Sequence, residues 1–330
     1  MALSAIVVSY QRRDLLAACL ESLERALEAC GGDAEVIVVD NASGDGVRDL
    51  VAERFPGVRL IALPDNMGFP AAVNAGVAQA RGDWILVLNN DTELADDSIA
   101  ELVRAGESLQ GVGAVSPQIR FAGSGSAINS AGIEIDALGV ASDRLLGLPP
   151  SASEEGPTEI FGASGGAALY RRAMFDDVGG MDESFFLYLE DVDLAWRARM
   201  RGWRSLYAPA AVVHHHHSAT TRHGSRLKYF HSGRNRVRLL AKNATGAQLA
   251  RHLPQILAYD VAYVVFAAVT DRTLAPLRGR LLGLRDWRRY RRSGAAGRVA
   301  IELPRSRGVR GALGRRAAWR EGSSSFAGRA

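Results

Sequence analysis

The segment from Asp83 to Glu93 constrains the fold of this chain more than any other. Five apolar residues, 84–88, lead directly into five polar residues, 89–93. A short apolar run with polar ends predicts a strand that is buried on both faces, as in the middle of an α/β sheet. Open α/β sheets bind ligands at the carboxyl ends of such strands, and the oxygen-bearing side chains here suit Mg²⁺ or Mn²⁺. The alternative is a buried strand that simply ends in a polar turn, and the rest of the chain has to decide.

The first 117 residues alternate between strand-like and helix-like patterns. Apolar segments at 5–9, 35–39, 58–63 and 112–116 predict further strands, and apolar residues spaced by four from Leu15 to Leu27 predict a helix. Strands that alternate with helices predict a largely parallel sheet with helices on both faces. The first strand is not followed by a Gly-x-Gly-x-x-Gly turn or a Walker-type phosphate loop, which disfavours a dinucleotide-binding fold.

The second half of the chain is less regular. Residues 118–157 are rich in glycine, serine and alanine, and they predict a long excursion with short strands, such as a binding lid. Residues 206–213 predict a short strand broken by Pro209. Four consecutive histidines, 214–217, follow this strand.

The C-terminal part combines an apolar helix with an excess of arginine. Gln255–Val269 predicts a helix interrupted by Asp260, and no apolar run is expected to reach the length of a membrane-spanning helix. From Arg272 onward the sequence contains many arginines but only three acidic residues, although the net charge of the whole chain is only +4. The basic stretch Arg285–Arg292 predicts binding to anionic lipid headgroups. The alternative is a basic helix that packs on the core or is solvated, and nucleic acid is not expected because no recognition motif accompanies the charge.

The N-terminus and the cysteines of the chain predict where in the cell the protein is located. The N-terminus lacks the basic start of a signal peptide, and the only cysteines, Cys19 and Cys30, fall in or beside a predicted helix. A disulfide framework is therefore not expected, and a reducing cytoplasm fits. We expect a cytoplasmic protein that binds peripherally to the inner face of the plasma membrane through its basic segment.

Four polar groups sit where strands end or a helix begins: Ser9 with Tyr10, Asp40 with Asn41, Asn89 to Asp91, and Glu190 to Asp193. In a parallel sheet the first three would meet at one edge. There Tyr10 would stack on a base, Asp40 would accept hydrogen bonds from base or ribose, and Asp91 would hold a metal on a diphosphate. The alternative for Asp40 is a turn rich in Asp and Asn that caps a helix.

The acids Glu190, Asp191 and Asp193 begin a predicted helix, where carboxylates are favourable for the helix dipole without any further role. The preceding apolar segment, 185–189, would desolvate a carboxylate and raise its pKa, which suits a general base. The histidine run has three interpretations: an expression tag, a solvated loop, or a metal ligand beside a carboxylate.

Together these motifs resemble family 2 glycosyltransferases with a GT-A fold, and most closely the bacterial rhamnosyltransferase-like branch. The matching segments lie in the expected order between about residues 3 and 240: Val7–Arg12, Val38–Asp45, Asn66–Phe69 with Asn74–Gly76, Leu88–Thr92, Gly179–Glu183, Phe186–Arg197, and Pro209 leading to the histidines. The resemblance implies an inverting, metal-dependent transfer of a sugar from a nucleotide diphosphate donor. The acceptor would be a hydroxyl of a glycan or lipid-linked acceptor in cell-surface polysaccharide synthesis. A dTDP-rhamnose donor is the first expectation and a UDP-sugar the second.

The resemblance also implies the roles of individual residues. Asp191 matches the catalytic base, with Glu190 beside it. Asp91 matches the last position of an Asp-x-Asp metal motif, whose first position is the neutral Asn89 here, so the site is short of charge for Mn²⁺ or Mg²⁺. His215, or its neighbour His217, matches a histidine ligand of that metal. The expected donor-binding residues are Ser9, Tyr10, Arg12, Asp40, Asn41, Asn66, Gly68, Asn74, Asn89 and Asn90, and the expected acceptor-binding residues are Gly165, Gly166, Tyr188 and Trp196.

The expected organisation is a GT-A domain over 1–245, followed by an amphipathic helical extension over 246–293 and a disordered basic tail over 294–330. The GT-A domain would divide into a nucleotide-binding half, 1–117, and an acceptor-binding and catalytic half, 118–245. Two alternatives remain for function. One is a non-catalytic nucleotide-sugar or glycan-binding module with the same fold. The other is a nucleotidyltransferase, which would need a glycine-rich phosphate turn after the first strand.

Overall fold

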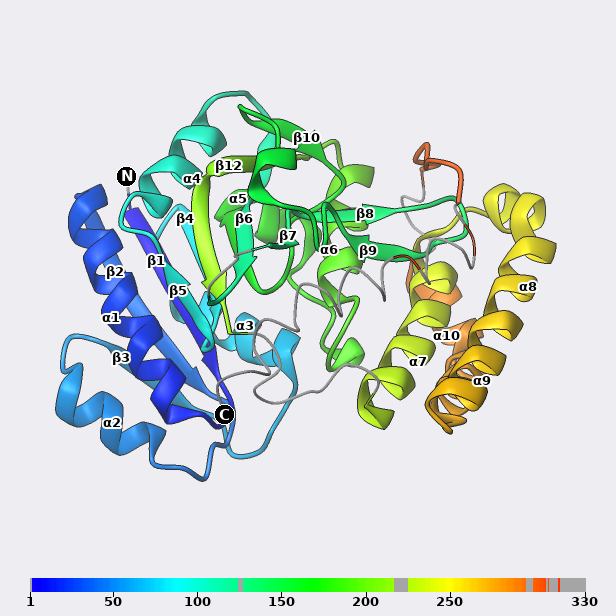
Figure 1. Ribbon diagram of the computed structural model, residues 1–330, viewed down its shortest axis with the longest axis horizontal. Coiled ribbons are helices and arrows are strands. Elements are labelled where there is room, and N and C mark those ends of the chain that lie inside the picture. The colour runs from blue at the N-terminus through cyan, green and yellow to red at the C-terminus, as the bar shows by residue number, and fades with distance from the viewer. Residues whose placement is uncertain are drawn as a thin grey trace.

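A ten-stranded mixed sheet forms the centre of the protein. The structure is a computed structural model, and it describes residues 2–123, 127–216, 225–294 and 299–306 and positions 308 and 314. Along the sheet the main strands follow the order β10-β12-β6-β11-β4-β1-β2-β3. Figure 1 shows the early helices α1 and α2 at one end of the molecule and a group of C-terminal helices at the other. The sheet edge between them is where the polar motifs meet.

The strand directions confirm the expected mixed, mostly parallel sheet. β1, β2, β3 and β4 pair in parallel, β6 and β12 pair in parallel, and β11 runs antiparallel to both of its neighbours. The bounds are β1 (Ala2–Ser9), β2 (Asp33–Asp40), β3 (Arg59–Ala62), β4 (Trp84–Asn89), β6 (Val112–Phe121), β10 (Thr158–Ile160), β11 (Ala167–Arg171) and β12 (Arg204–His215). Two short strands extend the main sheet: β5 (Thr92–Leu94) pairs with β12, and β7 (Ile128–Ser130) pairs with β6. The strands β8 (Ile133–Ile135) and β9 (Ala141–Asp143) form a separate antiparallel hairpin.

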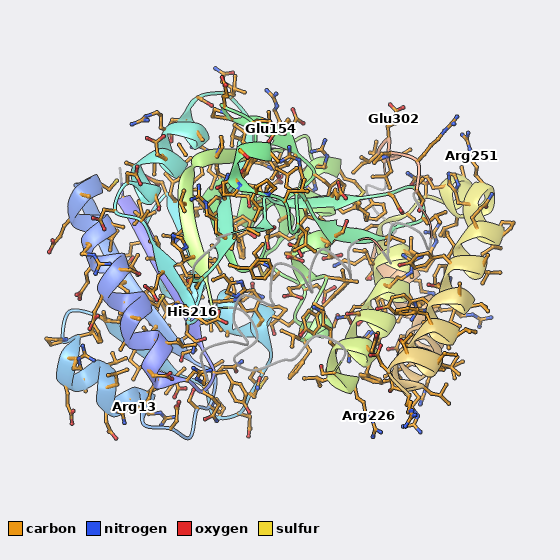
Figure 2. The ribbon with its side chains drawn as sticks, in the orientation of Figure 1. Arg13, Glu154, His216, Arg226, Arg251 and Glu302 are labelled. Carbon is orange, nitrogen blue, oxygen red and sulfur yellow. The ribbon has the colours of Figure 1, made fainter. Side chains whose placement is uncertain are left out.

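The strand β12 differs from its prediction. Pro209 does not break it, because the pairing with β6 shifts register between Ala208 and Val212 and so accommodates a residue without an N–H donor. β12 therefore continues to His215, which pairs with Thr92 of β5. This extension brings His215 and His216 beside the turn that follows β4, where His216 donates its N–H to the carbonyl oxygen of Asp91 at 2.8 Å; His216 is labelled in Figure 2.

Four helices form the C-terminal group: α7 (Arg226–Asn243), α8 (Gly246–Thr270), α9 (Ala275–Arg285) and α10 (Trp287–Ser293). The backbones of α7 and α9 approach closely at two glycines of α9. A Cβ at Gly279 would lie 2.1 Å from the carbonyl oxygen of Phe230, and a Cβ at Gly283 would lie 2.7 Å from that of Arg234. Larger residues at these two positions would force the helices apart.

Among the residues that the structure describes, α8 is one helix long and apolar enough, by length and composition alone, to cross a membrane. The sequence expectation that no apolar run reaches this length is therefore wrong. Asp260 interrupts the apolar run in the sequence, but its carboxylate lies 2.8 Å from Arg236 of α7 and 2.9 Å from Arg280 of α9. These ion pairs attach one face of α8 to its neighbours.

Part of the tail that was expected to be disordered lies against the helices. Gln248 donates a hydrogen bond to the carbonyl oxygen of Ile301 at 2.9 Å, and Ile301 and Leu303 pack on the nearby core. Residues 295–298 and nearly all of 307–330 lie outside the described residues.

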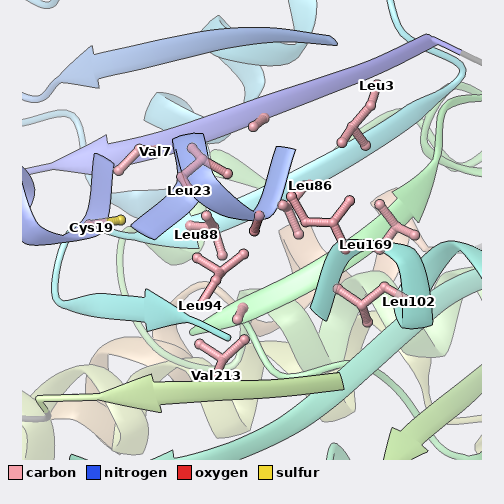
Figure 3. Packing of buried hydrophobic residues seen from close by; sticks show 14 of the residues in the cluster. Leu3, Val7, Cys19, Leu23, Leu86, Leu88, Leu94, Leu102, Leu169 and Val213 are labelled. Atoms are coloured by element: carbon pink, nitrogen blue, oxygen red, sulfur yellow. The ribbon is translucent and has the colours of Figure 1, made fainter. Parts of the chain in front are cut away.

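Helices cover both faces of the sheet, as predicted, because alternate residues of each central strand point to opposite faces. Ala5 and Val7 of β1 face one core, and Ile6 and Val8 face the other. The first core lies under α1 (Arg13–Cys30), α2 (Val47–Arg54) and α4 (Ser98–Glu107), and the second under α3 (Phe69–Gln79), α5 (Arg172–Val178) and α6 (Glu190–Met200). Figure 3 shows the first core, where Leu23 of α1 and Leu102 of α4 meet Leu86 of β4. Each such leucine contributes about 1.5–3 kcal/mol when fully buried.

Candidate active site

A cavity of about 450 Å³ lies between the carboxyl end of β4, the start of α6 and the C-terminal helices. Its volume is in the range of small-ligand sites. Its lining includes, from the sheet edge and α6, Asn89, Gly165, Gly166, Glu190, Asp191 and His215, and, from the loop before α6 and the C-terminal helices, Tyr188, Lys228, Arg236, Tyr259, Tyr263 and Arg280. The expected catalytic and metal-binding motifs therefore meet at one cavity.

Asp191 occupies the first turn of α6 and is held by two backbone N–H groups. Gly165 donates to its Oδ2 at 2.9 Å, and Val192 donates to its Oδ1 at 2.8 Å. Burial raises the pKa of Asp191, and although these two hydrogen bonds lower it, the nearby Asp143 raises it further and the net pKa is raised. A fixed carboxylate with a raised pKa in a cavity suits a general base.

Glu190 is buried beside Asp191 and lines the same cavity. Its Oε2 atom has no hydrogen-bond partner within the described part of the chain. Burial raises the pKa of Glu190, and the charge of Asp191 raises it further. Two adjacent buried carboxyl groups do not both ionise easily, so Glu190 retains its proton while Asp191 carries the charge.

The loop that leads into α6 has an unusual backbone. Phe186, Tyr188 and Leu189 have φ angles of 63°, 69° and 68°, which cost about 1–3 kcal/mol each for residues with a side chain. Asn235 of α7 is fully buried, and its amide donates to the carbonyl oxygens of Phe185 at 2.8 Å, Leu187 at 2.9 Å and Tyr188 at 2.7 Å. One side chain from α7 thus stabilises the turn that positions Asp191.

Asp91 and His215 lie close enough to share a metal ion. The Oδ1 atom of Asp91 is 3.1 Å from Nε2 of His215, and Nδ1 of His215 is 2.9 Å from Oδ1 of Asn129. With the proton on Nδ1 donated to Asn129, the lone pair on Nε2 is available to a metal. Burial alone would lower the pKa of His215, but Asp91 and Asp143 more than offset this effect, and the net pKa is raised.

The donor set fits a divalent cation that also binds phosphate oxygens and water. Mg²⁺ is commonly held in this way, by one or two carboxylates together with substrate phosphates. Within the described residues, no group of three or more His, Cys, Asp or Glu side chains is placed to hold a metal on its own. This agrees with the neutral Asn89 in the motif. His217, the alternative ligand, lies outside the described residues.

The end of β1 lies next to this metal motif. Asn90 donates to Oγ of Ser9 at 3.2 Å, which ties the two strand ends together. Tyr10 is exposed, as a residue that stacks on a base needs to be. Arg12 has a left-handed backbone with φ of 62°, and its guanidinium pairs with Asp14 at 2.9 Å and also interacts electrostatically with Asp91.

Asp40 is fully buried at the end of β2, and both of its oxygens have partners. Ser43 donates its N–H to Oδ1 at 2.8 Å, and Arg48 donates to Oδ2 at 3.0 Å. The first bond is the Asx turn that the alternative interpretation predicts. A carboxylate has further lone pairs, so a bound base would have to share Asp40 with these groups.

Asn41, Asn66 and Gly68 build a turn. The amide of Asn41 donates to Oδ1 of Asn66 at 3.0 Å, and its Oδ1 accepts from the N–H of Met67 at 2.8 Å. Gly68 has φ of 85°, and a Cβ there would lie 2.4 Å from the carbonyl oxygen of Phe186. These three residues hold the chain against the loop before α6, where Phe69 donates its N–H to the carbonyl oxygen of Phe186 at 2.8 Å.

Of the ten expected donor-binding residues, Asn89 lines the cavity and the other nine do not, and Asp91 and Trp196 do not line it either. Asn74 donates to the carbonyl oxygen of Met181 at 2.8 Å and to Glu183 at 3.0 Å, so it links α3 to the turn before α6. Trp196 is 1% exposed and packs edge-on against Phe161 with ring centroids 6.1 Å apart. Of the four expected acceptor-binding residues, the structure brings Gly165, Gly166 and Tyr188 to the cavity.

Asp193, the third acid of the motif, is fully buried and faces α7 instead of the cavity. It accepts hydrogen bonds from Arg197 at 2.7 Å, Lys242 at 2.8 Å and Asn243 at 2.8 Å. Burial alone would raise the pKa of Asp193, but Arg197 and Lys242 more than offset this effect, and the net pKa is lowered. Asp193 thus holds α6 onto α7.

We expect Asp193→Asn to lower the free energy of unfolding by about 3–5 kcal/mol, because it leaves buried cations without their carboxylate. The measurement is urea unfolding at pH 7. A carboxylate whose pKa is lowered by folding stabilises the protein above its unfolded pKa, so the difference from wild type should shrink as the pH falls below about 4. Asp182→Asn, which removes the second and more exposed partner of Lys242, should have a smaller effect. Equal stabilities of Asp193→Asn and wild type would contradict this role.

Several cavity residues were missed from the sequence. Asn129 and Asp143 belong to the irregular excursion, and Lys228, Arg236 and Arg280 belong to helices far along the chain. None of them follows a predicted strand or matches a motif, so no sequence signal marked them.

Comparisons with known proteins agree with this geometry. Residues 4–179 match the family model of Glycosyl transferase family 2. The chain is 32% identical over 243 residues to the N-acetylglucosaminyl-diphospho-decaprenol L-rhamnosyltransferase of Mycobacterium tuberculosis, with 67% of this chain and 78% of the relative covered. It is 25% identical over 252 residues to the low-salt glycan biosynthesis hexosyltransferase Agl10 of Haloferax volcanii, with 73% and 76% covered.

Two solved structures share the fold. GalNAc-T7 with UDP, GalNAc and Mn²⁺ superposes with a TM-score of 0.62 at 16% identity over 78% of this chain, which spans 51% of that longer protein. The mannosyltransferase PcManGT of Pyrobaculum calidifontis, in complex with GDP-Man and Mn²⁺, gives a TM-score of 0.51 at 20% identity, with 89% and 84% covered. The chain therefore belongs to glycosyl transferase family 2, resembles its rhamnosyltransferases, and has the GT-A fold.

Proposed function

We propose that this protein transfers a sugar from a nucleoside diphosphate donor to a hydroxyl of a lipid-linked acceptor, with inversion at the anomeric carbon. One observation carries the proposal: the carboxylate of Asp191 is fixed by Gly165 and Val192 in a cavity that His215 also lines, and Oδ1 of Asp91 lies 3.1 Å from Nε2 of His215. A positioned base beside a site suited to a metal and a diphosphate is what glycosyl transfer to a hydroxyl requires.

In the proposed reaction Asp191 takes the proton of the acceptor hydroxyl as its oxygen attacks the anomeric carbon. The bond to the nucleoside diphosphate breaks in the same displacement, so the configuration at that carbon inverts. Glu190 keeps its proton throughout and leaves the single charge on Asp191. A divalent cation held by Asp91 and His215 would offset the charge that develops on the departing diphosphate.

The relative from M. tuberculosis suggests both substrates. Its name specifies L-rhamnose transfer to N-acetylglucosaminyl-diphospho-decaprenol. We therefore propose dTDP-rhamnose as the first donor to test and UDP-sugars as the second, and a sugar joined to a lipid through a diphosphate as the acceptor class. Such acceptors serve the synthesis of cell-surface polysaccharides.

The test is a panel of nucleotide sugars with Mn²⁺ or Mg²⁺ and a short-chain lipid diphosphate sugar. Release of nucleoside diphosphate identifies the donor, and NMR of the product gives the anomeric configuration. Binding of nucleotide sugars without any release would favour a non-catalytic binding module. Formation of a nucleotide sugar from a sugar phosphate and a nucleoside triphosphate would favour a nucleotidyltransferase.

The proposed location is peripheral, at the cytoplasmic face of the membrane that holds the acceptor. Apolar residues repeat every four positions along one face of α8 and are between 49% and 74% exposed: Leu253, Leu257, Val261, Val265 and Val269. The next two helices, α9 and α10, also expose leucines and arginines: Leu277, Leu281, Leu284, Arg278, Arg285, Arg288 and Arg289. An apolar face flanked by arginines suits anionic lipid bilayers.

We expect the protein to float with anionic vesicles, and the double variant Val261→Asp/Val265→Asp to reduce the bound fraction at least about 10-fold, because charged groups replace apolar insertion. Leu109→Asp, at an exposed leucine beyond α4, is the matched control and should bind like wild type. Wild-type protein that stays with the soluble fraction would contradict the membrane location. A concentration-dependent dimer that the double variant abolishes would show that a second copy covers this face.

A further inference from the structure

The wall of the cavity that the C-terminal helices contribute is cationic. It contains Lys228 and Arg236 of α7 and Arg280 of α9, and tyrosines of α8 lie between them. The part formed by the sheet edge and α6 instead carries the carboxyl groups of Glu190 and Asp191. One cavity therefore presents a proton-accepting carboxylate, Asp191, from one part of the fold and positive charge from another.

The two arginines share a single acid. Asp260 lies 2.8 Å from Nε of Arg236 and 2.9 Å from Nη2 of Arg280, so two guanidinium groups face one carboxylate. Arg280 is 6% exposed, and its Nε–H has no hydrogen-bond partner within the described residues. A buried donor without a partner is rare in folded proteins and indicates a missing ligand or water. The cluster therefore keeps an excess positive charge and an unused donor at the cavity wall.

Lys228 is a second cation without a close partner. Its ammonium lies 5.4 Å from the ring centroid of Tyr188, and it makes no side-chain hydrogen bond or ion pair among the residues described. Burial lowers the pKa of Lys228, and the carboxyl group of Asp143 on β9 raises it only in part. The only other lysine of this arginine-rich chain, Lys242, is paired with Asp182 and Asp193. A partly desolvated ammonium at a cavity wall is stabilised when an anion binds beside it.

We propose that Lys228, together with the Arg236–Asp260–Arg280 cluster, binds the diphosphate that joins the acceptor sugar to its lipid. This inference rests on the proposed function, because it assigns a site to the acceptor of that reaction. The acceptor sugar then lies at Asp191 and its diphosphate at the cationic wall. The lipid leaves toward α8, whose inner residues Tyr259 and Tyr263 line the cavity and whose outer face is the exposed apolar surface.

The test compares two acceptors that differ in one group. One is N-acetylglucosamine joined through a diphosphate to a short prenyl chain, and the other is N-acetylglucosamine with a neutral alkyl chain of the same length. Lys228→Met should raise KM for the diphosphate acceptor about 10- to 100-fold, which corresponds to losing one charge-assisted contact. KM for the neutral acceptor and KM for the donor should stay at the wild-type values. Lys228→Arg, which keeps the charge, should restore most of the affinity.

Arg226→Met is the matched control, because it removes a positive charge from the same end of α7. Arg226 is exposed, does not line the cavity, and points outward from the molecule in Figure 2. The KM values of this variant for both acceptors should equal those of the wild-type protein. Lys228→Met with equal effects on both acceptors, or with a higher donor KM, would overturn the inference and assign Lys228 to packing or to the donor.

A second readout does not need turnover. Calorimetry with the diphosphate acceptor, in protein saturated with nucleoside diphosphate and Mn²⁺, should give a Kd about 10- to 100-fold higher for Lys228→Met than for Arg226→Met. Inorganic phosphate should compete with the diphosphate acceptor in wild type only at much higher concentration. Equal Kd values for the two variants would overturn the inference. Absence of transfer from every donor, with this difference in Kd intact, would instead overturn the proposed reaction and leave the anion site standing.

Discussion

Asp191→Asn will reduce kcat by about 10²–10⁴-fold while leaving the affinity for the donor nearly unchanged. The amide has the same shape as the carboxylate, so it can still accept the N–H of Gly165, but it cannot take a proton from the acceptor hydroxyl. The measurement is kcat with saturating donor and acceptor, beside calorimetric titration of the variant with nucleoside diphosphate. Wild-type turnover in Asp191→Asn would remove the assignment of the base.

Glu190→Gln provides the control for this prediction. An amide mimics a protonated carboxyl group, and Glu190 already holds its proton because burial and Asp191 raise its pKa. We therefore expect Glu190→Gln to retain most of the turnover. In wild type kcat/KM should fall as the pH drops through the raised pKa of Asp191, so the acid limb should lie above pH ~4, the ordinary range of an aspartate. A profile that is flat down to that pH would contradict the raised pKa.

Asp91→Ala should lower kcat/KM by about 10²–10³-fold and abolish the dependence of donor binding on Mn²⁺. Asp91 is the one carboxylate that the motif at the end of β4 directs toward His215, since Asn89 occupies the other acidic position of the family pattern. Removing it leaves an imidazole and neutral groups, which bind a hard cation poorly. The measurement is calorimetric titration with nucleoside diphosphate at several metal concentrations.

The variant Asp91→Asn tests whether metal binding needs the negative charge of Asp91 or only a side chain of the same shape. If the site needs the charge, the asparagine variant should resemble Asp91→Ala. If Asp91 serves mainly as a hydrogen-bond partner for His215, the asparagine variant should bind donor and Mn²⁺ as wild type does. An unchanged metal dependence in both variants would remove the metal assignment.

The sheet and its covering helices were predictable because each depends on local periodicity. The five apolar residues 84–88 fill β4, and both faces of β1 are buried as an α/β sheet requires. The path of β12 was not predictable, because proline removes one donor and only the pairing with β6 decides whether the strand continues past Pro209. The membrane-length helix α8 was missed for a similar reason: Asp260 interrupts the sequence pattern, but its charge is balanced by two arginines from other helices.

Prediction of the site divides in the same way. Asp91, Asp191 and His215 were predicted because they follow strands or begin a helix within recognisable motifs, and the structure places Asp191 and His215 at one cavity with Asp91 beside His215. Lys228 and Arg280 reach the cavity only through the packing of α7 against α9, which depends on the glycines of α9. The sequence also groups residues that the fold separates: Asp193 lies two positions after Asp191 but binds cations in the interior.

The buried amide of Asn235 has a consequence for how this sequence can change. It satisfies three carbonyl groups of a loop whose left-handed residues are favourable only while those bonds exist. Neither partner can be replaced alone, because losing the amide leaves the loop strained and losing the loop leaves a buried amide without acceptors. Across descendants of this gene we therefore expect position 235 and positions 186–189 to covary. A library randomised at both places should return far more folded combinations than the two single libraries together would suggest.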